Sequence, residues 1–466
     1  MFIGREYELN TLNKLHRSDK FEFTVIYGRR RVGKTALINE FTKDKDTIFF
    51  TGVETNAKQN LENLSGCIME YMSSVPINSS FSSFQSALEY VFELSKTRRL
   101  VFVIDEYPYV ARASKSLAST LQLLIDRYKD VSKLFLILCG SSMSYMEDHV
   151  LAYKAPLYGR RTSQIKLQPF DFFDTCRYFK EFSDVDKAMT YGFIGGTPQY
   201  LMQINNSMSV EENIKNTHLN PSSAVFEETT NLLKQEVREP AIYNAVITAI
   251  ANGCSKMNEI STNIGEDTSI CTGYIKNLIL LGIIKKELPY GEKSGRKTIY
   301  SIEDNMFRFW YRFVPENASV ITRGAADIAY KRIAPELPHY MGSVFEDICK
   351  QYLWRLLLKG KCAVNFIDLG RWWGANPKTR RQEEIDIMGT DRNTALFGEC
   401  KWTNENVDLN VLETLIERSK LFRYTDNHFY LFAKSGFTNG CIDRAHEMGN
   451  ATLLTLGDMI SEISDV

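Results

Sequence analysis

The stretch FTVIYGRRRVGKTALINEF, residues 23–41, decides the fold of the first third of the chain. Its opening, FTVIY, is mostly apolar and rich in β-branched and aromatic side chains, which predicts a strand, and its end, ALINEF, has the pattern of a helix. The residues between them fit G-x-x-x-x-G-K-[ST], a pattern that binds phosphate when it joins a strand to a helix. Backbone N–H groups of such a loop, and the N-terminus of its helix, point at the anion. The stretch therefore predicts a nucleotide-binding loop.

Four residues of this loop have expected tasks. Gly28 and Gly33 let the backbone approach the phosphates closely. Lys34 is expected to reach the β- and γ-phosphates of ATP, and the Thr35 hydroxyl is expected to bind Mg²⁺. The alternative is a chance match in an ordinary strand–turn–helix unit, which the flanking strand and helix make less attractive.

The composition sets broad limits on function. The chain has 466 residues and a net charge of −1, so contacts with nucleic acid must come from local basic patches rather than from bulk charge. Its nine cysteines are scattered without a C-x-x-C pair, which argues against disulfides and structural zinc. Met1 leads directly into FIGREYEL, and no apolar run is long enough to span a membrane. We therefore expect a cytoplasmic protein without a membrane partner.

A second apolar strand supplies carboxylates for the same site. The segment RRLVFVIDEYPYV contains a fully apolar run that ends in Asp105 and Glu106. A strand buried on both faces belongs in a parallel sheet, and ligands bind at the carboxyl ends of such strands. We expect Asp105 to hold Mg²⁺ through water and Glu106 to polarise the attacking water. The alternative is an ordinary acidic strand end.

Two later segments offer further polar groups. KLFLILCGSS predicts a third buried strand, after which the Ser141 hydroxyl could sense the γ-phosphate. In APLYGRRT, Arg160 or Arg161 could place positive charge on the phosphoryl group, in cis or from a neighbouring subunit. A polar turn and a solvated basic loop are the respective alternatives.

The order of these segments resembles the archaeal-type P-loop ATPases, which belong to the STAND branch of the AAA+-like NTPases. The resemblance is carried by FIGREYEL, GRRRVGKT, VFVIDEYPYV, CGSS, PLYGRRT and FIGGTPQYL. It implies that Arg5, within residues 4–6, packs near the adenine. It also implies that Pro198, within residues 195–198, belongs to a helical lid. A plain connection between two helices is the alternative for the second segment.

The order of helices and strands expected for residues 237–302 is typical of a winged helix-turn-helix. Three helices, the last ending at Gly282, are followed by a hairpin made of IIKKELP and TIYSI. The third helix could enter a DNA major groove. Cations near the wing could bind phosphates, namely Lys285, Lys286, Lys293, Arg296 and Lys297. The third helix is short of cations, so a role as a spacer or protein-docking unit stays open.

The stretch EEIDIMGTDRNTALFGECKW, residues 383–402, predicts two strands joined by a polar turn at residues 391–394. Alternate side chains of a strand share a face, so Glu399 and Lys401 point the same way. If the turn closes symmetrically, Asp386 lies opposite Glu399. Charges gathered on a half-apolar sheet need a partner or an ion.

The element order around this hairpin resembles the restriction-endonuclease-like PD-(D/E)XK fold. The resemblance implies that Asp386 and Glu399 ligate Mg²⁺, that Lys401 positions or activates the attacking water, and that Glu346 on the preceding helix orders the site. Clustered carboxylate oxygens bind a hard cation, and the cation and lysine stabilise the charge of phosphodiester attack. The alternative is a Lys401–carboxylate ion pair that stabilises a sheet edge.

Together these observations predict an α/β protein in four parts. A P-loop NTPase domain with a parallel sheet is expected over residues 1–168, a helical lid over 169–236, a winged helix-turn-helix over 237–302 and a restriction-endonuclease-like domain over 303–466. The expected function is ATP binding and hydrolysis linked to DNA or another nucleic acid, with a Mg²⁺-dependent nuclease site gated by the nucleotide. A nucleotide-switched regulatory scaffold that binds DNA without cleaving it is the alternative, and a ring-forming remodelling motor is a third. Self-association stays open.

Overall fold

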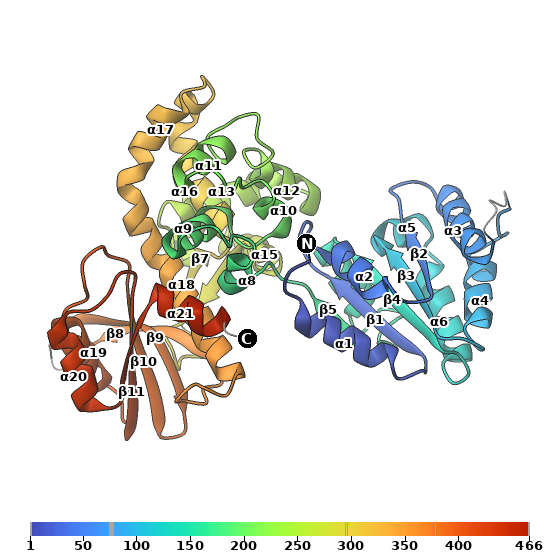
Figure 1. Cartoon of the computed structure of the whole chain (residues 1–466). Helices are drawn as coiled ribbons and strands as arrows, with labels where there is room; N and C mark the ends of the chain where they lie inside the picture. The colour runs from blue at the N-terminus through green and yellow to red at the C-terminus, as the bar shows by residue number, and fades with distance from the viewer. Residues whose placement is uncertain (1, 74–78, 294, 296, 378, 465–466) are drawn as a thin grey trace. The chain divides into compact units, whose positions relative to one another are not determined.

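The computed structural model describes residues 2–73, 79–293, 295, 297–377 and 379–464, and the chain divides into two compact units (Figure 1). The first unit comprises residues 1–169 together with residues 197–199. The second comprises residues 170–196 and 200–466. Across the described ranges, no helix has the length and apolar character needed to cross a membrane.

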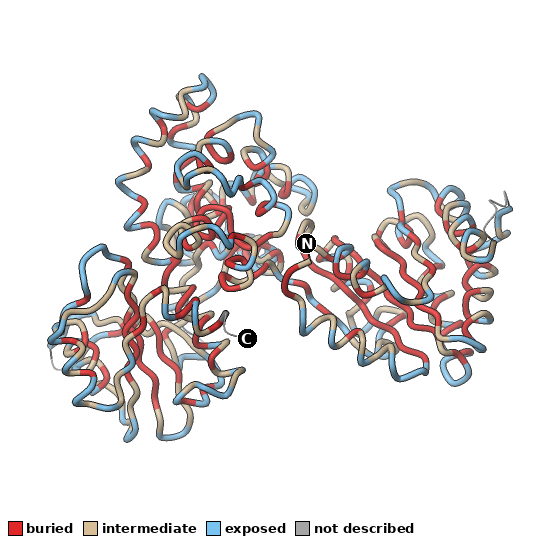
Figure 2. Tube along the Cα trace, viewed as in Figure 1, coloured by how far each residue is buried: buried red, intermediate tan, exposed pale blue. Residues whose placement is uncertain are grey.

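A five-stranded parallel sheet forms the centre of the first unit, in the order β2-β3-β4-β1-β5. Strands β1, β3 and β4 are buried along their whole length, as Figure 2 shows, which agrees with the predicted parallel sheet. The strands are β1 (Glu22–Tyr27), β2 (Thr47–Thr51), β3 (Leu100–Asp105), β4 (Leu134–Gly140) and β5 (Ser163–Lys166).

Helices of the first unit pack their apolar faces against this sheet. Leu37 and Ile38 of one helix join Val103 and Ile137 of the strands in a single buried cluster. The helices are α1 (Glu6–His16), α2 (Lys34–Thr42), α3 (Ala57–Met72), α4 (Phe84–Leu94), α5 (Tyr107–Ala113), α6 (Leu117–Tyr128) and α7 (Met143–Met146), followed by a π-helical turn at Glu147–Leu151. Because β4 lies between β1 and β3, the carboxyl ends of these three strands meet at one edge.

The second unit begins with helices and a hairpin. Three helices and a two-stranded antiparallel hairpin occupy the part of the chain between residues 240 and 302. The elements up to that point are α8 (Phe172–Cys176), α9 (Asp184–Ile194), α11 (Val210–Thr217), α12 (Glu228–Glu236), α13 (Pro240–Ala251), α14 (Met257–Ile264), α15 (Thr268–Leu280), β6 (Ile284–Glu287) and β7 (Ile299–Ile302). The short helix α10 (Pro198–Leu201) begins in the first unit and ends in the second.

Three further helices lead into the last sheet: α16 (Asn305–Ile321), α17 (Ala326–Ile333) and α18 (Leu337–Leu358), with a 3₁₀ turn at Ala334–Glu336. Aromatic side chains such as Phe307, Phe309 and Phe313 are buried on α16. These three side chains therefore pack into the interior of this unit.

A mixed five-stranded sheet completes the second unit, in the order β12-β11-β10-β9-β8. The pairs among β8, β9 and β10 are antiparallel, and those among β10, β11 and β12 are parallel. Apolar residues of α19 and α20 pack on one face of this sheet. The elements are β8 (Leu369–Ala375), β9 (Gln382–Asp391), β10 (Thr394–Lys401), α19 (Leu409–Ser419), β11 (Asp426–Ala433), α20 (Asn439–Met448), β12 (Ala451–Thr455) and α21 (Leu456–Ser464).

Strand β9 is irregular near Asp386. Its pairing with β8 runs from Gly370 opposite Met388 to Trp372 opposite Ile385, so β9 carries one extra residue between these pairs. Such a bulge bends the strand and turns the side chains around it. The bulge therefore falls on the part of β9 that contains the predicted metal-binding carboxylate.

Candidate functional site

The loop between β1 and α2 has the shape that the sequence predicts. Gly33, with φ of 91°, caps α2 in the left-handed region that glycine adopts without strain. A Cβ atom on Gly28 would lie 2.4 Å from the carbonyl oxygen of Leu167, so only glycine fits there. The buried Lys34 donates from Nζ to the carbonyl oxygens of Gly28 at 2.9 Å and Arg29 at 3.0 Å, which holds the ammonium group across the loop.

The predicted Mg²⁺-binding groups meet beside the loop. The Thr35 hydroxyl donates to Oδ2 of Asp105 at 2.8 Å, although the two residues lie on different elements. The Asp105 side chain is buried, and its Oδ1 accepts the backbone N–H of Glu106 at 3.0 Å. A hydroxyl and a carboxylate that lie within hydrogen-bond distance of each other supply the oxygen ligands that Mg²⁺ prefers in proteins. The residues present therefore fit this ion.

Glu106 is held by Ser141, the residue that follows β4. Its backbone has φ of 50° at the start of α5, a left-handed conformation that costs free energy for a residue other than glycine. The Ser141 hydroxyl donates to Oε1 of Glu106, and the Ser141 N–H donates to Oε2 at 3.3 Å. Ser141 thus contacts the carboxylate that was predicted to polarise water.

Two distant segments pack against the loop within the first unit. Arg5 donates from Nη2 to the carbonyl oxygens of Val32 at 3.1 Å and Gln168 at 2.6 Å. Arg29 donates from Nη2 to the Thr197 hydroxyl at 3.0 Å. A Cβ atom on Gly33 would lie 3.7 Å from Cγ of Pro198, so the predicted Pro198 segment also lies beside the loop.

Arg160, which was predicted to act on the phosphoryl group, forms an ion pair with a carboxylate instead. Its guanidinium group forms a two-pronged ion pair with Asp126 of α6, with Nε–Oδ1 at 2.9 Å and Nη2–Oδ2 at 2.6 Å. Its Nη1 donates to the carbonyl oxygens of Pro156 and Tyr158. In this conformation the side chain of Arg160 contacts Asp126 and its own loop, so a role on phosphate would require it to leave this pair.

A second group of predicted site residues, with charged side chains, lies on the hairpin of β9 and β10. The predicted turn is confirmed, because the register runs from Thr394 opposite Asp391 to Gly398 opposite Ile387. In this register the next residues along the two strands are Glu399 and Asp386. Oδ2 of Asp386 accepts the backbone N–H of Cys400 at 2.9 Å, which ties the carboxylate to β10 beyond the last ladder pair.

Glu399 is buried and lies between two cations. Lys401 donates from Nζ to its Oε1 at 2.7 Å, and Arg418 of α19 donates from Nη1 to its Oε2 at 3.4 Å. Arg418 also binds Glu383 at 3.1 Å. The sequence did not single out Arg418, because nothing in its helix distinguishes it from other basic residues until the fold brings it to β10.

Three carboxylates of this region influence one another. Burial, and next the charge of Asp386, raise the pKa of Glu346 on α18 above its usual value. Burial raises the pKa of Asp386. The pKa of Glu399 is raised mainly by burial and secondly by the negative charge of Asp386. Burial and like charge both disfavour the ionised form of a carboxyl group. The structure thus brings Glu346, Asp386, Glu399 and Lys401 into one electrostatic cluster.

This crowding of negative charge suits a divalent cation, and oxygen is the donor that Mg²⁺ prefers. Over the residues described here, however, no group of three or more His, Cys, Asp or Glu side chains is arranged to hold a metal ion. The ligation of Mg²⁺ by Asp386 and Glu399 therefore stays a prediction.

Comparison with protein families agrees with the geometry of the first unit. Residues 2–204 match a family model described as an ATPase domain predominantly from Archaea. Residues 310–412 match a second model, described as Archaea bacterial proteins of unknown function. The structure of the Walker-type ATPase PABY2304 of Pyrococcus abyssi is similar, with 18% sequence identity and a TM-score of 0.50. The structural match covers 67% of this chain and 96% of that chain. The chain carries an archaeal-type P-loop ATPase domain.

Two proteins of Methanocaldococcus jannaschii are related in sequence. The uncharacterized protein MJECL04 is 33% identical over 437 residues, which are 92% of this chain and 94% of that protein. The uncharacterized ATP-binding protein MJ0423 is 44% identical over 45 residues, 10% of this chain and 76% of that protein. The chain belongs to the same family as MJECL04.

Proposed function

We propose that this protein binds and hydrolyses ATP with Mg²⁺ in its first unit and, under control of the nucleotide, cleaves nucleic acid at the carboxylate cluster of its second unit. The observation that carries the first part is the convergence of Lys34, Thr35, Asp105 and Glu106 at the carboxyl edge of one parallel sheet. The second part is supported by the cluster of Glu346, Asp386, Glu399 and Lys401.

Each predicted site residue that lies at the phosphate loop of the first unit has a task in ATP hydrolysis. Lys34 exchanges the loop carbonyls that it now contacts for β- and γ-phosphate oxygens. Thr35 and Asp105 hold Mg²⁺, which supplies positive charge against the phosphates when bound. Glu106 accepts a hydrogen bond from the attacking water, and Ser141 keeps the carboxylate aimed at the γ-phosphate. Arg5 and the Pro198 segment support the loop near the nucleotide.

The proposed link to nucleic acid rests on the second unit. Helices α13–α15 followed by the β6–β7 hairpin support the assignment of a winged helix-turn-helix. The order of α18, the β9–β10 hairpin, α19 and β11 supports a restriction-endonuclease-like domain. Asp386 and Glu399 would hold Mg²⁺, Lys401 would position the attacking water, and Glu346 would order the site from α18.

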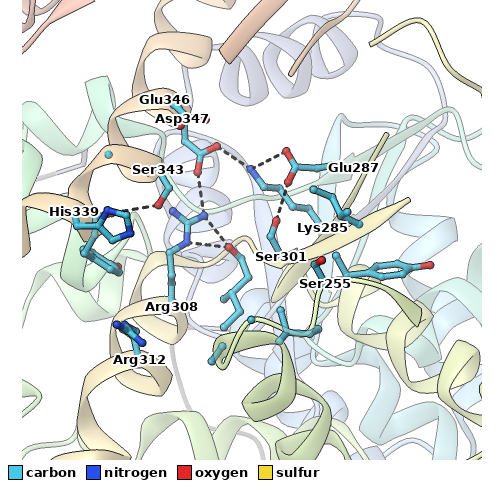
Figure 3. A pocket seen from close by; sticks show the side chains of 18 of the residues that line it. Ser255, Lys285, Glu287, Ser301, Arg308, Arg312, His339, Ser343, Glu346 and Asp347 are labelled. Atoms are coloured by element: carbon cyan, nitrogen blue, oxygen red, sulfur yellow. Dashed lines mark hydrogen bonds and ion pairs between the residues drawn. The ribbon is translucent and has the colours of Figure 1, made fainter. Parts of the chain in front are cut away.

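One predicted DNA contact is engaged in ion pairs within the protein. Lys285, expected to bind phosphate from the wing, is half-buried and pairs with Asp347 at 2.8 Å and with Glu287 at 3.7 Å (Figure 3). Its strand turns it inward because alternate residues face opposite sides, so Lys286 takes the exposed position. Lys297 is exposed and pairs with Glu292 at 2.8 Å, while Arg296 lies outside the described residues.

A second function is a nucleotide-switched scaffold that binds DNA without cleaving it. The observation that favours it is the state of Glu399, whose two oxygens each contact a cation, Lys401 and Arg418. A carboxylate that is neutralised in this way stabilises the domain and does not require a metal ion.

Plasmid and single-stranded DNA cleavage, with Mg²⁺ or Mn²⁺ and with or without ATP, separates the two functions. Wild type should cleave, Lys401→Ala should lose cleavage, and Lys34→Ala should lose the ATP response. Lys420→Ala is the matched control, because Lys420 is exposed at the end of α19 and pairs with the exposed Glu417. Intact ATP turnover without cleavage by wild type, under every condition, would favour the scaffold.

A further inference from the structure

The phosphate loop contains an arginine whose side chain reaches the turn after a neighbouring strand. Arg30 is the second residue after Gly28, and its Nη2 donates to the Tyr109 hydroxyl at 2.9 Å. Tyr109 lies in the first turn of α5, and its backbone N–H donates to the carbonyl oxygen of Glu106 at 3.0 Å. The guanidinium group of Arg30 is therefore tied to the turn that carries the carboxylate predicted to polarise water.

The groups around Arg30 mark where the terminal phosphate of ATP would lie. Lys34 spans the loop, and Thr35 contacts Asp105 at the predicted Mg²⁺ position. Glu106 follows Asp105 directly, so a water that it orients must approach the phosphate from this end of β3. The loop with Arg30 and the turn after β3 both lie at this carboxyl edge of the sheet, because β1 and β3 run parallel on either side of β4.

The two arginines that the sequence predicted for the phosphoryl group have other contacts in the first unit. Arg160 forms the two-pronged ion pair with Asp126 of α6. Arg161 donates to the carbonyl oxygen at the end of the π-helical turn. Negative charge develops on the phosphoryl group during hydrolysis, and an arginine is the side chain that often stabilises it. Arg30, by contrast, contacts the turn that begins at Glu106.

A guanidinium group at this position suits the γ-phosphate. It carries five N–H donors in one plane, so a hydrogen bond to a tyrosine hydroxyl is compatible with further bonds to phosphate oxygens. Hydrogen bonds between an arginine and phosphate are charge-assisted, and they are therefore stronger than a bond to a neutral hydroxyl. Arg30 is partly buried, which limits the screening of its charge by water. The bond to Tyr109 orients the guanidinium plane before the nucleotide binds, which lowers the cost of ordering it.

We propose that Arg30 binds the γ-phosphate of ATP and stabilises the negative charge that develops on it during hydrolysis, with Tyr109 as its positioning residue. In this step the water oxygen bonds to the γ-phosphorus, and the bond from that phosphorus to the β,γ-bridging oxygen breaks. ADP leaves with the bonding electron pair, the water proton moves toward Glu106, and inorganic phosphate remains. The inference rests on the proposed ATPase function and deepens it, because it places a catalytic positive charge within the loop itself.

Steady-state ATP hydrolysis and ADP titration of the full chain, both with Mg²⁺, test the proposal. Arg30→Gln should lower kcat about 100-fold or more, while the affinity for ADP, which lacks the γ-phosphate, stays within about 3-fold. Arg30→Lys keeps the charge without the planar fork and should recover part of the rate. Tyr109→Phe should lower kcat by about 3- to 10-fold, the loss of one neutral hydrogen bond. Arg127→Gln is the matched control and should keep the wild-type kcat, because Arg127 is exposed on α6 and pairs with Glu89 at 2.6 Å.

A second readout does not depend on turnover. ADP with aluminium fluoride imitates the transferred phosphoryl group, and wild type should bind it at least about 10-fold more tightly than ADP alone, a gain that Arg30→Gln should lose. The inference is overturned if Arg30→Gln keeps both the wild-type kcat and this gain. It is also overturned if Arg30→Gln loses ADP affinity and melting temperature together with kcat, as a purely structural residue would. A wild type that neither hydrolyses ATP nor shows the gain contradicts the proposed function itself, and the inference falls with it.

Discussion

Glu106 combines a left-handed backbone with a carboxylate that is held by Ser141, the residue after β4. Strain of this kind persists where the surrounding structure supports it, and it is frequent at functional sites. Changing Glu106 to Gln keeps the shape but removes the negative charge and replaces one acceptor oxygen by an NH₂ donor. We expect kcat for ATP hydrolysis to fall about 100-fold or more while ATP binding stays within about 3-fold of wild type.

Steady-state ATPase kinetics and nucleotide titration measure the two effects separately. Glu40→Gln is the control, because Glu40 lies on the helix after the loop and pairs with Lys43 at 2.6 Å on the surface. If Glu106→Gln hydrolyses ATP at the wild-type rate, another residue must orient the water.

Glu346 gives a prediction about pH. Its folded pKa lies above its unfolded pKa because of burial and the charge of Asp386, so ionisation weakens the folded state. The free energy of unfolding should therefore fall as the pH rises through the range in which Glu346 ionises. Glu346→Gln removes this cost and should be more stable than wild type at about pH 8, by roughly 1–2 kcal/mol.

Urea unfolding at a series of pH values, in the presence of EDTA, measures this difference. At about pH 3, where the carboxyl group is mostly protonated in both states, the stability difference caused by ionisation should be gone. A Glu346→Gln protein that is less stable than wild type at about pH 8 would show that the ionised side chain is stabilising, as in a simple pair with Lys350.

At the scale of elements, the phosphate loop begins at Gly28, directly after β1, and packs closely against Leu167, directly after β5. The methyl group in Gly28→Ala would press on the Leu167 carbonyl, a backbone atom that cannot turn aside. We expect this change to lower the free energy of unfolding of the first unit by about 1–3 kcal/mol. Thermal or urea unfolding measures it. Gly66→Ala is the control, because its Cβ would meet nothing within 4 Å and alanine favours a helix.

Patterns of neighbouring residues predicted most elements correctly. The buried strands around Val25, Val103 and Leu136 were readable because a parallel strand is apolar on both faces. The β9–β10 turn was readable because a short polar turn fixes the register of its two strands. These features depend on residues close together in the chain.

Contacts between distant residues were not predictable from such patterns. The bulge at Asp386 depends on how β9 pairs with both of its neighbours, and the sequence does not state that pairing. Lys285 was assigned to the surface because its partner Asp347 lies 62 residues further along the chain. Arg418 likewise joins the carboxylate cluster only through the packing of α19 on the sheet.

At the scale of the whole molecule, two units with separate cores should unfold in two transitions. ATP with Mg²⁺ binds the native first unit and therefore should raise the melting temperature of one transition by several degrees, in proportion to the binding free energy. Differential scanning calorimetry measures both transitions, and Lys34→Ala should remove the shift. One transition that moves as a whole with ATP would indicate that the units unfold together.

Residues 197–199 return to the first unit after 27 residues that belong to the second. The Arg29–Thr197 hydrogen bond and the approach of Pro198 to Gly33 are therefore lost from any fragment that stops at residue 169. The match to the archaeal ATPase family, which runs to residue 204, includes this return. In evolutionary terms, gene fusion or recombination could transfer a complete nucleotide-binding module only with the intervening helices attached. Those helices are therefore expected to be inherited with the ATPase, whatever domain follows them.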